Sequence, residues 1–189
     1  ASTQDSMQTM IDWQNGMGLT VEQMKELSDV TVTLFDKSSA KSAGDLMKFT
    51  AYAGQFAKTA HLSAKETMAF GSAITGLAPE AASTSFKNML NVMVSGVHAT
   101  KQQAVAFSRL GLDVAEVAKS METDASGTVV NVLKKIKSTI PEYEQAAFTA
   151  STFGSSGSEA AIQYMNDLKK LETQLGLVKN SANYDGRLA

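Results

Sequence analysis

Apolar residues recur along most of the chain at spacings of three and four, the pattern that places one face of an α-helix against a core. Five such stripes lie in residues 46–60, 70–77, 82–97, 129–140 and 161–178. The last runs through Ala161, Tyr164, Leu168, Leu171, Leu175 and Val178. It keeps a heptad step for too short a distance to indicate a coiled coil, so it predicts one long helix packed on its neighbours.

The segment 29–35, DVTVTLF, does not follow this pattern. It alternates and is rich in β-branched residues, which favours a half-buried strand, and taken alone it is equally compatible with strand and helix. No second run of this kind offers a pairing partner, and a lone strand would leave its backbone groups unpaired. We therefore predict a helix here.

Polar residues that typically begin helices precede several stripes. The capping-box pattern, in which a hydroxyl and a Glu or Gln three residues later satisfy each other's backbone amides, fits Thr20 with Gln23 and Ser63 with Glu66, and less perfectly Asp113 with Glu116 and Ser156 with Glu159. Pro79 and Pro141 are placed as first helical residues. A leucine precedes Thr20, Ser63, Ala78 and Asp113 alike, but at intervals too uneven for a solenoid repeat.

Three stretches rich in small and polar residues predict linkers: 38–44, 121–127 and 154–158. Together with only two prolines, these signals predict an all-α fold. We expect a compact array of about eight to ten short helices and helical hairpins with a longer C-terminal helix. Residues 1–189 would form one helical module, with a subdivision into 1–122 and 123–189 as the alternative.

Composition narrows the class of protein. The hydrophobic fraction of 43% beside 19% charged residues is typical of a folded globular chain. The net charge of −2 provides no basic field for nucleic acid, so no sequence-specific nucleic-acid binding is expected. No apolar run approaches the roughly 20 residues of a membrane-spanning helix. The absence of cysteine excludes disulfides and cysteine-based zinc sites. Because the chain begins at Ala1 and ends on a polar stretch, we expect an internal fragment of a longer protein.

Few residues offer catalytic or metal chemistry. His61 and His98 are 37 residues apart without acidic or histidine partners at helical spacing, so both are interpreted as polar residues at helix ends. Glu66 and Glu80 could form a carboxylate pair of the kind that glycosidases use. Both, however, fall in the first turn of a predicted helix, where a carboxylate stabilises the helix dipole. We therefore predict no catalytic, cofactor-binding or metal-binding residue and no cofactor.

Three further features have structural interpretations. The GSSGS run at 154–158 lacks the lysine of a phosphate loop and the Gly-x-Ser-x-Gly pattern of a nucleophile elbow, so it predicts a helix stop after Phe153 and a new start. Of the ten methionines, Met89 and Met93 lie on a predicted core stripe. The five small residues 81–85 predict close approach of one helix to another.

At this stretch the sequence resembles the core region of phage tail tape measure proteins. The segments LSAKETMAF and TGLAPEAASTSFKNML, between Leu62 and Leu90, follow the family's order of a capped helix, a glycine link and a small-residue helix. Positions that match or are similar are Gly76, Ala82, Thr84, Phe86, Lys87, Met89 and Leu90, whereas Ser83 replaces a typical glycine. AVAFSRLGLDV, DASG and EYEQAAFTASTFGSSGSEA continue the likeness, which covers roughly Met17 to Leu168.

The resemblance implies a noncatalytic structural module in a phage or prophage tail, with a part in tail assembly and tail length determination. It implies a location in the tail interior of the virion, and in the host cytoplasm during assembly. Expected partners are tail tube, baseplate or tail assembly chaperone proteins, or copies of the same chain in a homo-oligomer. As a single helix the chain would span only about 280 Å, and its caps predict repeated turns, so we expect a folded interaction segment and not the measuring rod.

Two alternatives remain open at this point. Some tape measure proteins carry peptidoglycan-cleaving domains, and an all-helical lysozyme-like fold is compatible with the composition. No polar hairpin of the kind that accompanies a lysozyme-like glutamate is found. The other alternative is a helical adaptor unrelated to phage.

Overall fold

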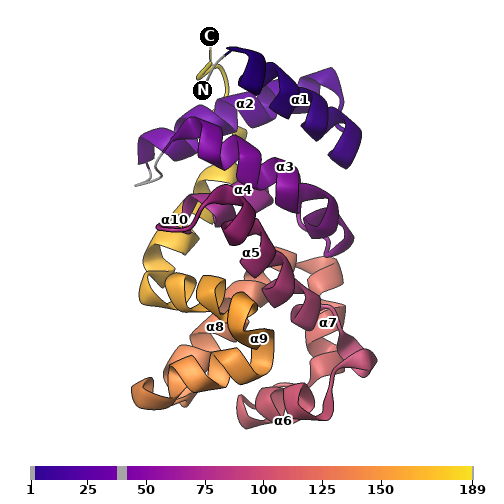
Figure 1. The fold of residues 1–189 in the computed structure, drawn as a ribbon, viewed down its shortest axis with the longest axis vertical. Helices are drawn as coiled ribbons and strands as arrows, with labels where there is room; N and C mark the ends of the chain where they lie inside the picture. The colour runs from indigo at the N-terminus through magenta and orange to yellow at the C-terminus, as the bar shows by residue number, and fades with distance from the viewer. Residues whose placement is uncertain (1–2, 38–41, 189) are drawn as a thin grey trace. The chain divides into compact units, whose positions relative to one another are not determined.

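The computed structural model describes residues 3–37 and 42–188. Within these residues the chain forms ten α-helices, two short 3-10 helices and no strand (Figure 1). The elements are α1 (Thr3–Met17), α2 (Val21–Lys37), α3 (Ala43–Thr59), α4 (Ala64–Ser72), α5 (Pro79–Met93), η1 (Gly96–His98), α6 (Lys101–Arg109), α7 (Val114–Thr123), α8 (Ala125–Thr139), α9 (Glu142–Asn166), α10 (Leu168–Lys179) and η2 (Ser181–Asn183). The all-α prediction is confirmed, including a helix across 29–35.

The helices form two compact units. Unit 1 comprises residues 1–83 and 169–189, and unit 2 comprises residues 84–168. The boundary of unit 1 thus falls inside α5, and the chain returns to unit 1 with α10. The prediction of one module over 1–189, with its alternative subdivision after residue 122, stays a prediction.

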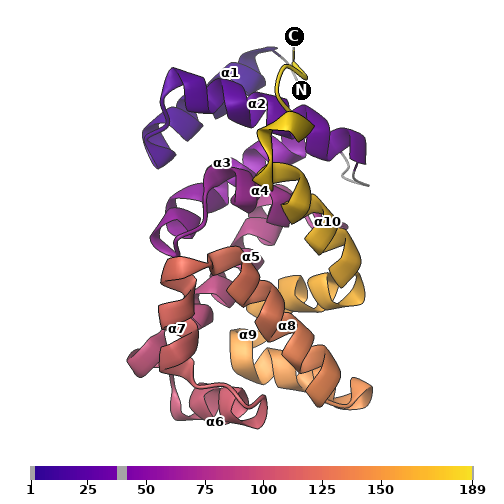
Figure 2. The same ribbon diagram turned by 180° about the vertical axis from the view of Figure 1, so that it is seen from behind.

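Unit 1 is built around α3, which packs on α1, α2 and α4. Trp13 of α1 is fully buried and donates its indole N–H to the carbonyl of Met47 on α3 at 3.0 Å. Phe49 and Phe70 add aromatic side chains from α3 and α4 to the same core. Figure 2 shows α10 alongside these N-terminal helices, where its buried residues complete the core.

Unit 2 packs α7 on α8, α8 on α9, and α6 on both α7 and α9. Its core contains Phe86, Phe107, Leu133 and Tyr164, all 1% exposed or less. These come from α5, α6, α8 and α9, so each of the predicted stripes in this unit contributes to one core. In the residues that the structure describes, no helix combines the length and the apolar character needed to cross a membrane.

The capping signals act as predicted at the first three sites. Thr20 and Gln23 exchange hydrogen bonds between side chains and amides, and Ser63 with Glu66 forms a complete capping box. Asp113 accepts hydrogen bonds from the amides of Ala115 and Glu116. Each of the four leucines that precede these signals follows a residue of positive φ: Gly18 (64°), His61 (67°), Gly76 (84°) and Gly111 (72°). A left-handed residue, a leucine and a helix start thus form a recurrent connection.

Some boundaries differ from the predictions. The seam 161–178 is buried at most positions but is divided between α9 and α10, because Asp167 leaves helical geometry with φ −143° and ψ 67°. The prediction of one continuous helix there was wrong. Val97, predicted as part of a core stripe, is 83% exposed, because α5 ends at Met93 and the chain turns through η1. Pro141 stands at the position before α9, without a side-chain capping hydrogen bond, and is not its first residue.

The structure also differs from the predicted linkers. Between α7 and α8 the linker 121–127 reduces to Asp124, whose side chain accepts from the amide of Gly127 and starts α8. In the linker 38–44, residues 38–41 lie outside the described residues, and Ser42 caps α3. The helix stop after Phe153 is confirmed, because Gly154 breaks α9 with φ 79° and ψ 163°.

Candidate docking site of the C-terminal segment

The residues considered for catalysis lie at helix ends, where their contacts stabilise the fold. Glu66 belongs to the capping box of α4, and Glu80 lies in the first turn of α5, where it accepts a hydrogen bond from the hydroxyl of Tyr52 at 3.3 Å. His61 follows the end of α3, and His98 is the last residue of η1, so both lie at helix ends and both are exposed. Their predicted positions are confirmed. No group of three or more His, Asp or Glu side chains in the described ranges is arranged to hold a metal.

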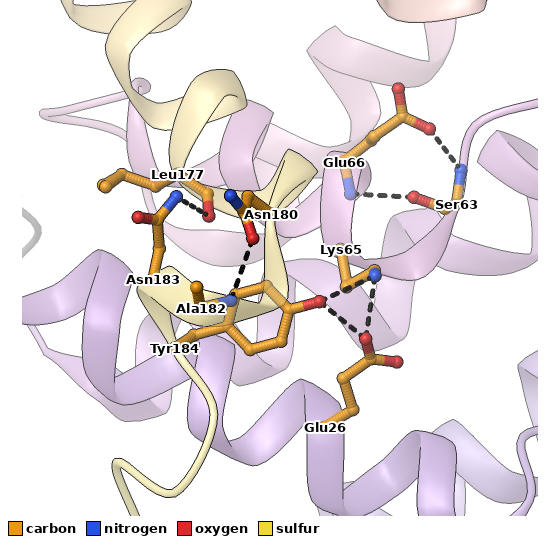
Figure 3. A network of polar contacts seen from close by, with 9 residues as sticks. All are labelled: Glu26, Ser63, Lys65, Glu66, Leu177, Asn180, Ala182, Asn183 and Tyr184. Atoms are coloured by element: carbon orange, nitrogen blue, oxygen red, sulfur yellow. Dashed lines mark hydrogen bonds and ion pairs between the residues drawn. The ribbon is translucent and has the colours of Figure 1, made fainter.

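The most developed polar site in unit 1 joins the C-terminal segment to α2 and α4. Tyr184 donates its hydroxyl hydrogen to Glu26 of α2 at 2.6 Å. Lys65 of α4 donates to the same Glu26 oxygen at 2.8 Å and to the Tyr184 hydroxyl at 2.9 Å (Figure 3). The Lys65 ammonium also lies 5.4 Å from the centre of the Tyr184 ring, within the range of a cation–π contact. Three residues from distant parts of the sequence thus form a closed triangle.

The triangle changes the proton affinity of each member. The hydrogen bond from Lys65, followed by that from Tyr184, lowers the pKa of Glu26. Burial raises the pKa of Tyr184, and its hydrogen bond to Glu26 adds to this rise. Burial alone would lower the pKa of Lys65, but its hydrogen bonds to Glu26 and Tyr184, together with the charge interactions with the same two groups, outweigh burial and raise it. The ionised carboxylate, the neutral phenol and the ammonium are therefore the favoured set.

A second carboxylate on the same helix holds the backbone beyond Tyr184. Asp29 is 5% exposed, and its two oxygens accept the amide hydrogens of Gly186 at 3.1 Å and Leu188 at 2.7 Å. These hydrogen bonds satisfy a buried charge that would otherwise be strongly unfavourable. Glu26 and Asp29 are three residues apart on α2, so they share one helix face.

Helix α10 is held differently. Leu171, Leu175 and Val178 are buried, and Gln174 is 1% exposed. The Gln174 amide donates to the hydroxyl of Ser72 at 3.0 Å and to the carbonyl of Leu34 at 3.4 Å. One buried amide therefore ties α10 to both α4 and α2.

A cavity of about 230 Å³ borders the triangle. Met17, Leu27, Gly54 and Leu62 give it apolar walls, and Lys58 and Lys65 are among its polar lining residues. It is smaller than the roughly 300 to 1,000 Å³ of a typical ligand pocket. Its size therefore gives no support to a cofactor site.

In unit 2 the small residues predicted to allow close packing do so at one point. Ser85 of α5 is fully buried, and its hydroxyl donates to the carbonyl of Ser156 and accepts the amide hydrogen of Ala160 at 2.8 Å. The Ser85 side chain therefore contacts the backbone of α9 at a carbonyl and an amide that lie one helical turn apart.

The residues of the docking site were not predicted from the sequence. Glu26 and Tyr184 are 158 residues apart, and no local pattern marks either of them. The one local signal in this region is Asn180, whose side chain accepts the amide hydrogen of Ala182 and starts η2. A polar residue that begins a short turn at the end of a helix could have been read from the sequence.

Comparison with known proteins identifies the family. A family model described as phage-related minor tail protein matches residues 1–154. The chain belongs to this family of phage-related minor tail proteins. It is also 30% identical over 189 residues to a probable tape measure protein of Halomonas phage phiHAP-1. That alignment covers 99% of this chain and 22% of the relative, so the chain spans about a fifth of the relative's length.

No solved structure matches this phage-related minor tail protein. Membership in the family supports a structural role in a phage tail, and it confirms the resemblance found in the sequence. The family match ends at residue 154, whereas unit 1 is completed by residues beyond 168. Helix α10 and Tyr184 therefore lie outside the matched range, whereas Glu26, Asp29 and Lys65, which contact the C-terminal segment, lie inside it.

Proposed function

We propose that this chain is a noncatalytic structural module of a phage tail tape measure protein, with a part in tail assembly and tail length determination. It would act in the tail interior of the virion, and in the host cytoplasm while the tail assembles. Its partners would be tail tube, baseplate or tail assembly chaperone proteins, or further copies of the chain. The alignment of nearly the whole chain with a probable tape measure protein is the observation that carries this proposal.

The local structure supports a folded module over a measuring rod. The longest helix, α9, has 25 residues and is broken at Gly154. At about 1.5 Å per residue it would span roughly 38 Å even if it were unbroken, against roughly 280 Å for the whole chain as one helix. Capped ends at α3, α4, α6, α7 and α8 stabilise the chain in this divided form.

A deletion in a phage whose tail protein carries this module separates a role in assembly from a role as a measuring rod. We expect an in-frame deletion of residues 3–188 to reduce the number of assembled tails, because an assembly contact is lost. A deletion of equal length elsewhere in the same protein is the control. Electron microscopy of negatively stained particles gives both tail number and tail length. Normal numbers of tails that are shorter in proportion to the deletion would show that the segment acts only as a length of measuring rod, and would contradict its proposed part in tail assembly.

The partners can be tested with the purified chain. We expect it to retain at least one of three purified protein types in a pull-down: tail tube, baseplate or tail assembly chaperone. A measurement of mass in solution would detect self-association. A chain that stays monomeric and retains none of these proteins would remove the support for an interaction module.

The noncatalytic part of the proposal rests on the surroundings of Glu66 and Glu80. Glu66 is engaged in its capping box, and Glu80 accepts from Tyr52. We expect no clearing of a peptidoglycan suspension by the purified chain. Clearing that is abolished by Glu66→Gln or Glu80→Gln would instead support a lysozyme-like activity.

A further inference from the structure

The last part of the described chain differs from the helix before it in how it is held. After α10 ends at Lys179, Asn180 adopts an extended conformation with φ −127° and ψ 118°. Its side chain starts η2, and the chain then turns past Tyr184. We call residues 180–188 the C-terminal strap.

The strap is attached to unit 1 through one buried ring and a few polar contacts. Tyr184 is 2% exposed and belongs to the core, but Leu188 is 57% exposed, and Asp185, Gly186 and Arg187 are exposed as well. Because apolar burial is the main source of cohesion in a protein core, the apolar attachment of the strap rests mainly on the ring of Tyr184. Its polar contacts are those of Tyr184 with Glu26 and Lys65, and of its backbone with Asp29.

Helix α10, in contrast, contributes buried Leu171, Leu175 and Val178 to the core and is tied to α2 and α4 by Gln174. Removing α10 would open that core to water at several positions, whereas removing the strap would expose mainly the surface under Tyr184. The charged groups under the strap would also be hydrated once it left. The way the chain is attached to unit 1 therefore changes at Asn180, between helix α10 and the strap.

We propose that the C-terminal strap is a conformational device that detaches from α2 and α4 as a unit, while the helices of unit 1 remain folded. When it is closed, Tyr184 covers part of the Glu26 and Lys65 pair, and Asp29 is shielded from water. When it is open, two carboxylates and an ammonium become a free charged surface on α2 and α4. This goes beyond the proposed structural role, and it stands or falls independently of any tail partner.

Hydrogen exchange of the full 189-residue chain tests the device directly. We expect the amides of Gly186 and Leu188 to exchange at least about a hundredfold faster than buried amides of α3, after correction for intrinsic rates. Their exchange should be insensitive to low concentrations of urea, because a local opening exposes little new surface. Asp29→Asn should accelerate exchange at both amides by about tenfold or more, since each loses a charged acceptor.

Two variants complete the test. Asp185→Asn removes a carboxylate from the strap itself, at an exposed position, and should leave exchange at Leu188 unchanged. Tyr184→Phe keeps the buried ring but removes the hydroxyl bonds, so it should accelerate exchange in the strap even if Asp29→Asn fails to fold. The proposal is overturned if wild-type strap amides exchange with the rates and urea dependence of α3. It is also overturned if Tyr184→Phe accelerates α2, α3 and α4 as much as the strap.

Discussion

Ser85 of α5 accepts the amide hydrogen of Ala160 of α9 at 2.8 Å. The Ser85 hydroxyl donates its own hydrogen to the carbonyl of Ser156, four residues before Ala160 on the same helix. One buried side chain thus bonds to the backbone of α9 both as an acceptor and as a donor. This contact is what the run of small residues at 81–85 permits.

Replacing Ser85 by alanine should destabilise the protein by about 1 to 3 kcal/mol, because a buried donor and a buried acceptor both lose their partner. Ser83→Ala is the matched control. Ser83 is also buried, but its hydroxyl bonds only to the carbonyl of Glu80, one turn back in the same helix. Urea denaturation followed by circular dichroism measures both. If Ser85→Ala cost no more than Ser83→Ala, the contact between Ser85 and α9 would add no stability beyond that of a local hydrogen bond.

Gly157 lies where the backbone of α9 passes close to that of α5. A methyl group at this position would lie 3.2 Å from the backbone nitrogen of Met89 and 3.3 Å from the Cβ of Asn88. Backbone atoms cannot move aside cheaply, so Gly157→Ala should destabilise the protein by about 1 to 3 kcal/mol.

Gly176 provides the opposite case. It lies within α10 and is exposed, and a methyl group added there would extend into open space, with no packed neighbour within 4 Å. Gly176→Ala should therefore stabilise the protein by about 0.5 to 1 kcal/mol, because alanine restricts the unfolded chain and favours helix. Thermal unfolding of the two variants should shift in opposite directions. A stabilising Gly157→Ala would mean that the two helices are not in close contact.

Local chemistry was readable from the sequence, and contacts between distant residues were not. The capping boxes at Thr20 and Ser63 follow from residues three positions apart. Thr100 with Gln103 forms another complete capping box, which carries the same signal and was not predicted. The small residues at 81–85 predicted a close approach, but only the structure gives its partner, Ala160.

The errors have a common cause. The apolar stripe that ends at Val97 and the seam 161–178 keep helical spacing across points where the backbone turns, at Gly96 and at Asp167. The spacing of apolar residues indicates which side chains face a core, but it does not indicate whether they all belong to one helix. The site at Tyr184 depends on α2, α4 and the C-terminal segment meeting in space, and no pattern within a few residues reports that.

The left-handed position before Leu62 offers a simple gain in stability. His61 has φ 67°, and the corresponding residues before Leu19, Leu77 and Leu112 are all glycine. Because a left-handed conformation is unfavourable for a residue with a Cβ by roughly 1 kcal/mol, His61→Gly should stabilise the protein by about that amount. Gly111→Ala should destabilise it similarly. Differential scanning calorimetry of both variants checks the pair, and an unchanged or lower melting temperature for His61→Gly would contradict it.

The stability of unit 1 should fall in acid partly because of Glu26. Its pKa is lowered in the folded protein by the hydrogen bonds from Lys65 and Tyr184, so folding favours the ionised form. The stabilisation is therefore complete above the ordinary carboxyl pKa of 4.5 and is lost as the pH falls through the lower folded value. Because the Glu26 side chain is 35% exposed, we expect a modest effect that salt weakens.

Urea midpoints measured between pH 7 and about pH 3 should fall less steeply for Glu26→Gln than for the wild type. Glu22→Gln, which removes an exposed carboxylate from the first turn of the same helix, should keep the wild-type slope more closely. Equal slopes for Glu26→Gln and the wild type would mean that the contact with Lys65 and Tyr184 does not persist in solution.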